Sequence, residues 1–410
     1  MNLTRKLIGI SLPDLTLQSS GLVILFALVH TVSDAVTNML SALLPTLQNR
    51  FELSETVLAL LVATLSFSAL VTQPFFGALA DRLGNRRIAA LGVIGNAVLF
   101  SLIGIISNLS VLFGLILVGG LASAALHPAI ASMARQVGGK KPEVAVGLFS
   151  AGGTLGIAIG PIIIMVLLAN LGLSFTAWLM IPSVLFGVLL LMLPSEDPGP
   201  DVDAKTKLFD FGILAGPVGL LALTGILSNV AFVTFTSAMP LWLVREHNLP
   251  NNSTLIGWTL STFSLAAAFG GIVGGLVSNN VGTKRLVVGS LLIALLRLYT
   301  IFFLAPGSPI YFAMVFLAGA LVNAGMPMLI VTAQDYSPKA AATAAGMLMG
   351  FSAGVAGLVY VGIGRLQESL GLTPAIMVAY LALVIGAVLA LVAIKSNKAH
   401  DEPPVDATSC

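Results

Sequence analysis

The sequence GALADRLGNRR at residues 77–87 returns 198 positions later, in altered form, as GLVSNNVGTKR at residues 275–285. In both segments an apolar stretch ends at a polar turn, and a pair of basic residues follows a glycine, Gly84 in the first and Gly282 in the second. A glycine at such a place permits a tight turn between two helices. The two segments therefore indicate two equivalent helix connections in two related halves of the chain.

Two prolines extend the repeat beyond this turn. Pro128 matches Pro327 at an offset of 199, and Pro45 matches Pro240 at an offset of 195. Small differences in offset are what loops of different length would produce. Three matches in nearly the same register predict two homologous halves in parallel orientation, an arrangement typical of carriers that bind their substrate at mid-membrane.

The composition requires a lipid environment for most of the chain. Of 410 residues, 57% are apolar and only 9% are charged, whereas a soluble domain has about 25% charged residues. A membrane-spanning helix needs about 20 apolar residues. Twelve stretches satisfy this, and we predict spans at 19–44, 55–80, 88–107, 109–134, 144–170, 173–193, 213–243, 254–278, 286–305, 309–333, 340–364 and 372–394.

The longest polar stretch between spans divides the chain. Residues 194–212 are rich in proline and acids, so we interpret them as a cytoplasmic linker between a six-helix bundle at 1–193 and another at 213–394. Residues 395–410 are expected to form a disordered cytoplasmic tail. The predicted fold class is an all-α membrane protein with twelve transmembrane helices in two six-helix bundles related by pseudo-twofold symmetry.

The basic residues predict the orientation. With both termini in the cytoplasm, fifteen of the nineteen lysines and arginines lie in cytoplasmic segments, three lie outside and Arg297 lies within a span. Cytoplasmic segments of membrane proteins carry such an excess. We therefore expect a multi-pass protein of the cell inner membrane with both termini cytoplasmic. The first 18 residues do not read as a cleavable signal peptide, because Pro13 and Asp14 interrupt a short apolar run.

Residues 77–87 resemble the loop signature of the major facilitator superfamily, which lies between the second and third helices of that fold. The resemblance implies a conformational latch that holds the two halves together at the cytoplasmic face in one state and releases them in the other. The plainer reading is a charged turn that obeys the positive-inside rule. The latch residues would be Gly77, Asp81, Arg82, Gly84, Arg86 and Arg87. The second copy has asparagines at 279 and 280, so its latch should be weaker.

The fifth span contains Gly147, Gly156, Gly160 and Pro161, which resemble part of the glycine–proline motif of facilitator antiporters. The family pattern continues with two further glycines, whereas isoleucines follow here. Glycines at this spacing form a smooth face for close helix contact. We expect their partner to be the glycines at 270–275 in the eighth span, and ordinary helix packing without an antiport role is the alternative.

Four ionisable residues lie inside predicted spans, where such groups are costly and are candidates for function. His30 and Asp34 are one helical turn apart and share a face. We predict that Asp34 gains and loses a proton during transport and that His30 either shares this proton or adjusts how tightly Asp34 holds it. The alternative is that the two residues form a hydrogen-bonded pair that only holds spans together. His127 lies beside Pro128, which interrupts the helix. His127 is a candidate for binding protons or substrate, and the alternative is a histidine that only packs in the interior. Arg297 is expected to extend outward to the membrane interface.

Three asparagines complete the predicted substrate cavity. Asn38 continues the polar stripe of the first span beyond Asp34, and Asn229 matches Asp34 in the seventh span at an offset of 195. Asn323 is a weaker candidate in the tenth span. These side chains would add hydrogen-bonding groups around the ionisable residues.

A narrower resemblance concerns the first half of the chain. His30-x-x-x-Asp34, His127-Pro128 and FSAGGTLGIAIGP at 149–161 resemble the fosmidomycin-resistance type of facilitator exporter. This resemblance implies proton-driven efflux of a drug or small metabolite by rocker-switch alternating access. The span-4 arginine of many drug–proton antiporters has no counterpart here, so coupling would have to rest on Asp34 and the histidines. The charge of the substrate stays open. The drug that names the subfamily is an anion, whereas the single acid in the predicted cavity favours a cationic or neutral substrate.

Several functions compete with efflux. Proton-coupled uptake of a small organic solute shares every feature of the fold, and a non-transporting receptor would need a signalling domain that neither linker nor tail supplies. We expect no enzyme activity, because no nucleophile–base pair, metal-ligand spacing or phosphate-binding loop is present, and the single cysteine is Cys410. The expected partners are a small-molecule substrate, protons and the lipid bilayer, for a monomer with no cofactor, no metal and no nucleic acid.

Overall fold

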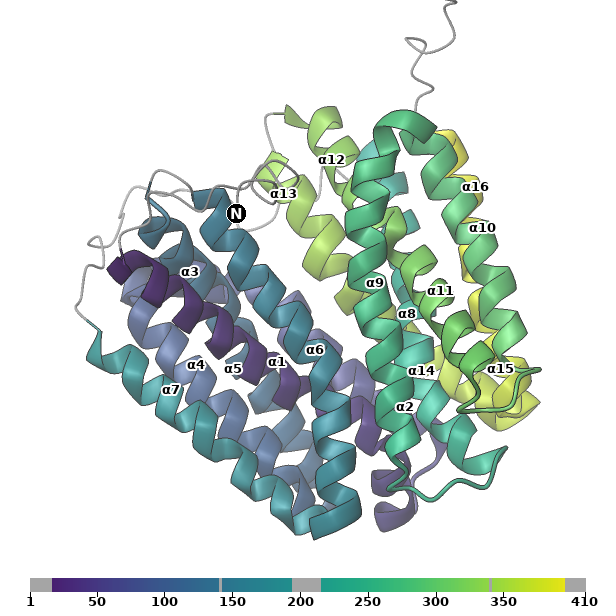
Figure 1. Cartoon of the computed structure of the whole chain (residues 1–410), viewed down its shortest axis with the longest axis horizontal. Coiled ribbons are helices and arrows are strands. Elements are labelled where there is room, and N and C mark those ends of the chain that lie inside the picture. The colour runs from purple at the N-terminus through teal and green to yellow at the C-terminus, as the bar shows by residue number, and fades with distance from the viewer. Residues whose placement is uncertain (1–16, 140–141, 194–214, 339–340, 395–410) are drawn as a thin grey trace, which may run out of the picture. The chain divides into compact units, whose positions relative to one another are not determined.

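The computed structural model describes residues 17–139, 142–193, 215–338 and 341–394, and the regular secondary structure of these ranges is helical (Figure 1). The predicted linker at 194–212 and tail at 395–410 lie outside the described residues. The α-helices are α1 (Leu17–Phe51), α2 (Glu55–Ser66), α3 (Gln73–Leu83), α4 (Asn85–Ser101), α5 (Leu109–Val137), α6 (Pro142–Leu171), α7 (Met180–Met192), α8 (Pro217–Arg245), α9 (Thr254–Val281), α10 (Thr283–Ile301), α11 (Pro309–Ala324), α12 (Met326–Tyr336), α13 (Ala341–Gly346), α14 (Ser352–Leu370), α15 (Leu372–Tyr380) and α16 (Ala382–Ala393).

Eleven helical stretches among the described residues are long and apolar enough to cross a membrane. Several combine two labelled helices; Glu55–Ala80, for example, joins α2 and α3 through the π-helix Phe67–Val71. The remaining predicted span, 286–305, corresponds to α10, which has 19 residues and carries Lys284, Arg285 and Arg297. The helices thus follow the twelve predicted spans, and the prediction of an all-α membrane protein is confirmed.

The contacts group the chain into two compact units. One comprises Met1–Met39, Thr72–Gly160 and Leu171–Lys205, and the other comprises Leu40–Val71, Pro161–Asn170 and Thr206–Cys410. The division therefore differs from a cut at the linker, because the last third of α1, all of α2 and the end of α6 pack with helices of the C-terminal half. The division into bundles at 1–193 and 213–394 stays a prediction.

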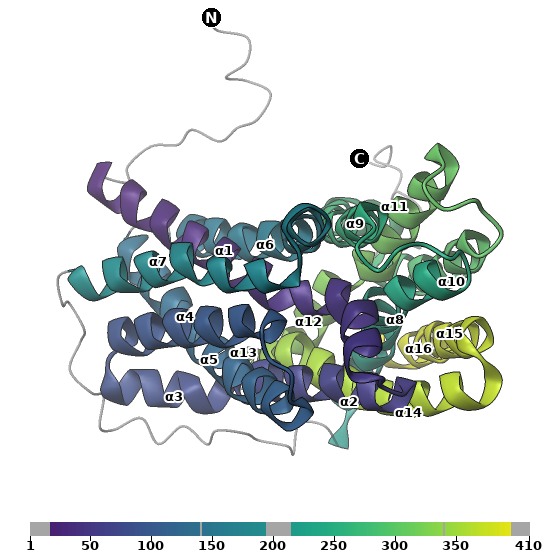
Figure 2. The same ribbon diagram turned by 90° about the horizontal axis from the view of Figure 1, so that it is seen from below.

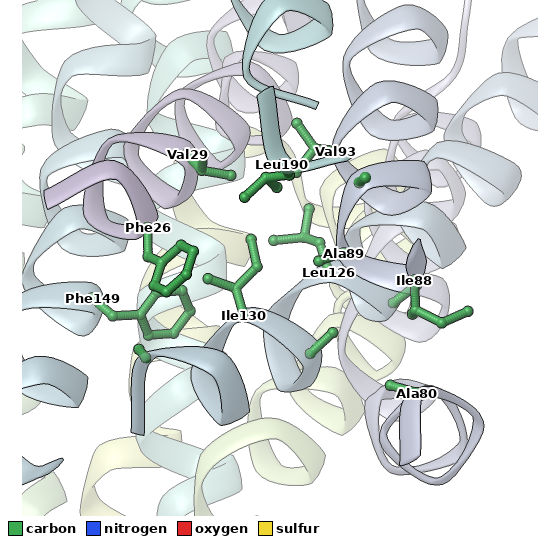
Figure 3. Packing of buried hydrophobic residues seen from close by; sticks show 14 residues of the cluster. Phe26, Val29, Ala80, Ile88, Ala89, Val93, Leu126, Ile130, Phe149 and Leu190 are labelled. Atoms are coloured by element: carbon green, nitrogen blue, oxygen red, sulfur yellow. The ribbon is translucent and has the colours of Figure 1, made fainter. Parts of the chain in front are cut away.

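The core of the first unit is built mainly from small and aliphatic side chains of six helices, with two phenylalanines. Phe26 of α1 and Phe149 of α6 lie next to one another in this cluster, Ile130 of α5 lies beside them, and Ala89 of α4 lies further along, next to Leu126 (Figure 3). All five side chains are at most 8% exposed. This packing holds α1, α4, α5 and α6 in a defined arrangement, which positions the polar residues one turn further along α1.

The predicted repeat is visible in the backbone. Gly84 between α3 and α4 has φ 97° and ψ 126°, and Gly282 between α9 and α10 has φ 86° and ψ 135°. Residues with a side chain rarely adopt this conformation. Both glycines end one helix and begin the next, so the two halves of the chain use the same turn at corresponding places.

In the second unit, α2 packs closely on α14 (Figure 2). A Cβ atom on Gly364 would lie 2.8 Å from the carbonyl oxygen of Glu55, so a glycine is needed for this approach. The Glu55 carboxylate also pairs with the Arg245 guanidinium at the end of α8. The Glu368 carboxylate accepts a hydrogen bond from the backbone N–H of Thr56 at 2.9 Å. These contacts tie the start of α2 to helices of the C-terminal half.

The expected partner of the fifth-span glycines is wrong. Gly270 and Gly274 pack on α11, where a Cβ atom would lie 1.9 Å from the carbonyl oxygen of Ala320 and 2.1 Å from that of Ala324, respectively. Small residues let two helix backbones approach closely wherever the packing brings them together, and here α9 packs along α11. The fifth-span glycines contact α1 instead, as described below.

Candidate functional site

Asp34 lies between two histidines in the interior of the first unit. Its Oδ2 is 3.2 Å from Nε2 of His30 on the same helix, and its Oδ1 is 3.1 Å from Nε2 of His127 on α5. The side chains of His30 and Asp34 are 9% and 11% exposed, and that of His127 is 20% exposed. The structure therefore brings together three of the predicted site residues, one of them from 93 positions away in the sequence.

Backbone carbonyl groups fix the orientation of both imidazole rings. Nδ1 of His30 is 2.8 Å from the carbonyl oxygen of Phe149, and Nδ1 of His127 is 2.6 Å from that of Ser123. A carbonyl oxygen can only accept a hydrogen bond, so each Nδ1 must carry the hydrogen. The His30 ring also stacks on the Phe149 ring, with centroids 4.1 Å apart and planes inclined by 17°.

These orientations determine how many protons the three side chains can hold. With Nδ1 occupied, Nε2 of a neutral ring carries no hydrogen and would repel a carboxylate oxygen. Each of the two contacts with Asp34 therefore needs one further proton, on the nitrogen or on the oxygen. Two such protons bring the triad of His30, Asp34 and His127 to a net charge of +1. Loss of one proton makes the triad neutral and leaves one contact without a hydrogen.

Hydrogen bonds on another side of α1 hold this helix against α4. The Asn96 side chain donates to Oγ1 of Thr37 at 2.8 Å, and Oγ of Ser33 donates to Oδ1 of Asn96 at 3.3 Å. Asn96 is fully buried, so its amide group is satisfied inside the protein as buried polar groups require. With that side of α1 fixed, His30 and Asp34 are directed toward α5 and α6.

Small residues let α6 approach α1 at the level of the triad. A Cβ atom on Gly152, Gly156 or Gly160 would lie within 2.2–2.4 Å of the carbonyl oxygen of Ala27, Thr31 or Ala35, respectively. Both series advance four residues at a time, which is the spacing of one helix face. Figures 1 and 2 show α1 and α6 side by side. Two of the predicted antiporter-type glycines thus lie in this contact, whereas a Cβ atom on Gly147 would have no neighbour within 4 Å.

Gly153 makes space for the His30 ring itself. A Cβ atom there would lie 2.3 Å from Cε1 and 2.5 Å from Nε2 of His30. The ring is held from the other side by Phe149, so it cannot turn away and keep both of its polar contacts.

We therefore expect Gly153→Ala to displace His30 from Asp34 and to impair transport more than it impairs folding. The matched control is Gly147→Ala on the same helix, which introduces the same methyl group into open space. Transport activity and the melting temperature of the purified variants would be compared. Transport by Gly153→Ala at the level of Gly147→Ala would contradict a role for the His30 position.

The three predicted asparagines make other contacts. Asn38 donates to the backbone carbonyl of Asp34 at 2.9 Å, and Asn229 donates in the same way to Gly225 in its own helix. Asn323 donates to the carbonyl of Ala267 at 2.9 Å and so joins α11 to α9. Asn38 lies one turn from the triad, whereas Asn229 and Asn323 belong to the second unit. Their role in a cavity stays a prediction.

The predicted latch residues lie at the turn between α3 and α4. The guanidinium group of Arg86 donates to the carbonyl of Leu191 at 3.3 Å and to that of Leu193, so it caps the end of α7 within the first unit. Arg82 and Arg87 are exposed, and the side chain of Asp81 lies outside the described part of the structure. A Cβ atom on Gly77 would lie 3.5 Å from Cβ of Pro128, next to His127. The turn is therefore connected to α5 and α7 inside the first unit, and its function as a latch stays a prediction.

Several residues of the site were not predicted from the sequence. Gly152 and Gly153 could have been found, because Gly152, Gly156 and Gly160 have the four-residue spacing of a helix contact. Phe149 and Ser123 contribute backbone carbonyl groups, for which a sequence has no signal. Among the described residues, the potential metal ligands that come close together are those of the triad, within 4.8 Å. Shared protons are sufficient to explain the contacts among these three side chains. The expectation of no metal stays a prediction.

The sequence matches the model of the Major Facilitator Superfamily over residues 26–359 and 221–409. It is 24% identical to the Fosmidomycin resistance protein of Escherichia coli (strain K12) over 363 residues, which cover 85% of this chain and 87% of that protein. It is 29% identical to the Multidrug resistance protein MdtG of Enterobacter lignolyticus (strain SCF1) over 243 residues, or 57% of each chain.

Solved structures resemble most of the chain. A bacterial homolog of the human lysosomal transporter Spinster, in an inward-facing and occupied conformation, has a TM-score of 0.76 at 18% identity and covers 91% of this chain and 96% of its own. The nucleoside transporter NupG has a TM-score of 0.70 at 16% identity, and the match covers 92% of this chain and 98% of NupG. At these identities the likeness concerns the fold.

Proposed function

Because the chain belongs to the Major Facilitator Superfamily, and is thus a multi-pass membrane transporter rather than an enzyme, we propose that it exports a drug or small metabolite in exchange for protons. The efflux-type relatives support export. The proposed location is the cell inner membrane with both termini in the cytoplasm, as the distribution of basic residues favours. We propose that the carrier acts as a monomer.

The observation that carries this proposal is the position of Asp34 between His30 and His127. A carboxylate and two imidazoles that are brought together can share and exchange protons, and histidine is the side chain most often used for this purpose. Backbone carbonyl groups fix the orientation of both rings, so the loss of one proton removes one of the two contacts of Asp34. The contact with His127 joins α1 to α5, and the contact with His30 lies within α1. Proton occupancy would thereby change how firmly α1 and α5 are held together.

Such a change can bias two conformations of the carrier. A ligand shifts a conformational equilibrium only by as much as its affinity differs between the two states. In the proposed cycle, protons favour one state, and a substrate that competes for Asp34 favours the other. The contacts of Glu55 with Arg245 and of Thr56 with Glu368 join α2 to α8 and α14. During rocker-switch alternating access, these contacts would break when the carrier opens on their side of the membrane and form again when it closes.

The charge of the triad bears on the substrate. A cation, or a solute that donates hydrogen bonds, would compete with protons at Asp34 and would be exchanged for them. An anion would be attracted to the form with net charge +1 and would move together with the protons. We therefore propose a cationic or neutral solute for the antiport mode.

Everted membrane vesicles with an acidified lumen test both the coupling and the direction. A lipophilic dye cation, a neutral drug and fosmidomycin would be added in turn while a pH-sensitive dye reports the lumen. We expect at least one cationic or neutral compound to raise the luminal pH, because its entry releases protons. Vesicles without the carrier are the control.

Two outcomes would contradict the proposal. Further acidification of the lumen upon addition of a compound would indicate that protons and solute move together, as in a symporter. Accumulation of the compounds without any change of luminal pH would indicate a carrier that is not coupled to protons.

A further inference from the structure

An apolar groove of about 330 Å³ lies along the surface of the second unit, between α9, α10 and α11. Its walls include Phe269, Val273 and Val281 of α9, Ile293 of α10 and Leu321 of α11. Phe269 is 53% exposed and Ile293 is 44% exposed, so the groove is open along its length rather than closed over. All of these residues except Val281, which lies just beyond the end of a span, belong to predicted spans, where the neighbour of such a surface is lipid.

The groove exists because small residues line its floor. Gly270 and Gly274 of α9 pack against the backbone of Ala320 and Ala324 of α11, which brings these helices close together and leaves no side chains between them. Gly289 of α10 also lines the groove, and a Cβ atom there would have no neighbour within 4 Å. The hollow is therefore a permanent feature of the backbone arrangement.

The groove extends over roughly the depth of one lipid leaflet. From Phe269 to Val281 the helix advances 12 residues, which is about 18 Å at 1.5 Å per residue. The hydrocarbon core of a bilayer is about 30 Å thick, so one leaflet contributes about half of this. An acyl chain that lies along α9 could thus follow the groove from the end of the helix to the middle of the membrane.

The end of the groove at the α9–α10 turn is basic. Arg285 lines the groove there and is exposed, and Lys284 precedes it. Within the part of the chain that the structure describes, Arg285 has no ion pair with an acidic side chain. The turn belongs to the basic side of the protein, which the positive-inside rule assigns to the cytoplasmic leaflet, where anionic lipids attract such residues.

We propose that this groove binds an anionic phospholipid of the cytoplasmic leaflet, with one acyl chain between α9, α10 and α11 and the headgroup phosphate at Arg285. The apolar walls accommodate the chain, and the guanidinium group forms paired hydrogen bonds with phosphate oxygens. The site is separate from the triad in the first unit, and it does not depend on which solute the carrier transports.

Lipid-dependent stability of the purified full-length carrier tests the headgroup part of the site. Thermal unfolding in detergent would be measured with added phosphatidylglycerol and with phosphatidylcholine of the same acyl chains. A ligand that binds the folded state raises the melting temperature. We expect a larger rise with phosphatidylglycerol, and we expect Arg285→Gln to reduce this rise to that of phosphatidylcholine. Arg135→Gln, which removes an exposed charge in the last turn of α5, should keep the full difference.

A second variant tests the acyl-chain part. Gly289→Leu places a side chain in the groove, where its Cβ atom would have no neighbour within 4 Å, and it should abolish most of the rise with either lipid. Gly114→Leu on α5 is the matched control, because a Cβ atom there also has no neighbour within 4 Å. Equal stabilisation by the two lipids, a lipid response of Arg285→Gln equal to that of Arg135→Gln, or an undiminished response of Gly289→Leu would overturn the proposal.

Discussion

Asp34→Asn is expected to reduce proton-driven transport to the background of vesicles without the carrier, while the protein still folds. The asparagine amide has almost the same shape as the carboxylate. Its N–H group can donate to one histidine, and its oxygen can accept from the other, so the contacts at 3.2 and 3.1 Å can persist. However, the amide cannot take up or release a proton, so the variant lacks the carboxylate that links the protons of the two rings.

The measurement is substrate-induced pH change in everted vesicles, together with the melting temperature of the purified protein. Asn38→Ala is the matched control on the same helix, one turn further along. Asn38 donates only to the backbone carbonyl of Asp34 in the structure, so its loss removes a polar group without changing the proton inventory. We expect this variant to remain coupled to protons, and loss of a cavity hydrogen bond would show only as a weaker apparent affinity for the substrate. Efflux driven by a pH gradient at the wild-type rate in Asp34→Asn would refute the assignment of Asp34.

Replacement of Gly156 by alanine is expected to lower the stability of the first unit strongly. The added methyl group would lie 2.2 Å from the carbonyl oxygen of Thr31 and 3.0 Å from Cβ of Asp34. Backbone atoms cannot rotate out of the way as side chains do, so α1 and α6 must separate along their whole contact. Overpacking of a dense interior costs about 1–3 kcal/mol, and occasionally more. The yield of folded carrier and its melting temperature should both fall.

Gly147→Ala is the control for Gly156→Ala, because both change a glycine of the same helix and of the same predicted motif. A Cβ atom on Gly147 has no neighbour within 4 Å, so this variant should melt at the wild-type temperature. If the two variants had equal stability, the close packing of α6 on α1 would not be needed for the fold. If both folded but only Gly156→Ala lost transport, the contact would serve the conformational change rather than stability.

The fold class, the approximate limits of the helices and the repeat could all be predicted from the sequence. These properties depend on residues that are close together in the sequence. Apolar stretches of about 20 residues must form helices in lipid, because no water is present to form hydrogen bonds with the backbone N–H and C=O groups. The conformation shared by Gly84 and Gly282 was also implied by the sequence, since only glycine adopts it readily. The pairing of His30 with Asp34 followed from their separation of one helical turn.

Only the tertiary structure decided which distant groups meet. Whether His127 of α5 reaches Asp34, and which carbonyl groups hold the two rings, depends on how α1, α5 and α6 pack, and helix packing is decided by side chains far apart in the sequence. For the same reason the glycines at 270–275 were assigned to the wrong partner, because two smooth helix faces match equally well in a sequence. The lipid groove likewise arises where three helices meet over small residues, which no single segment reveals.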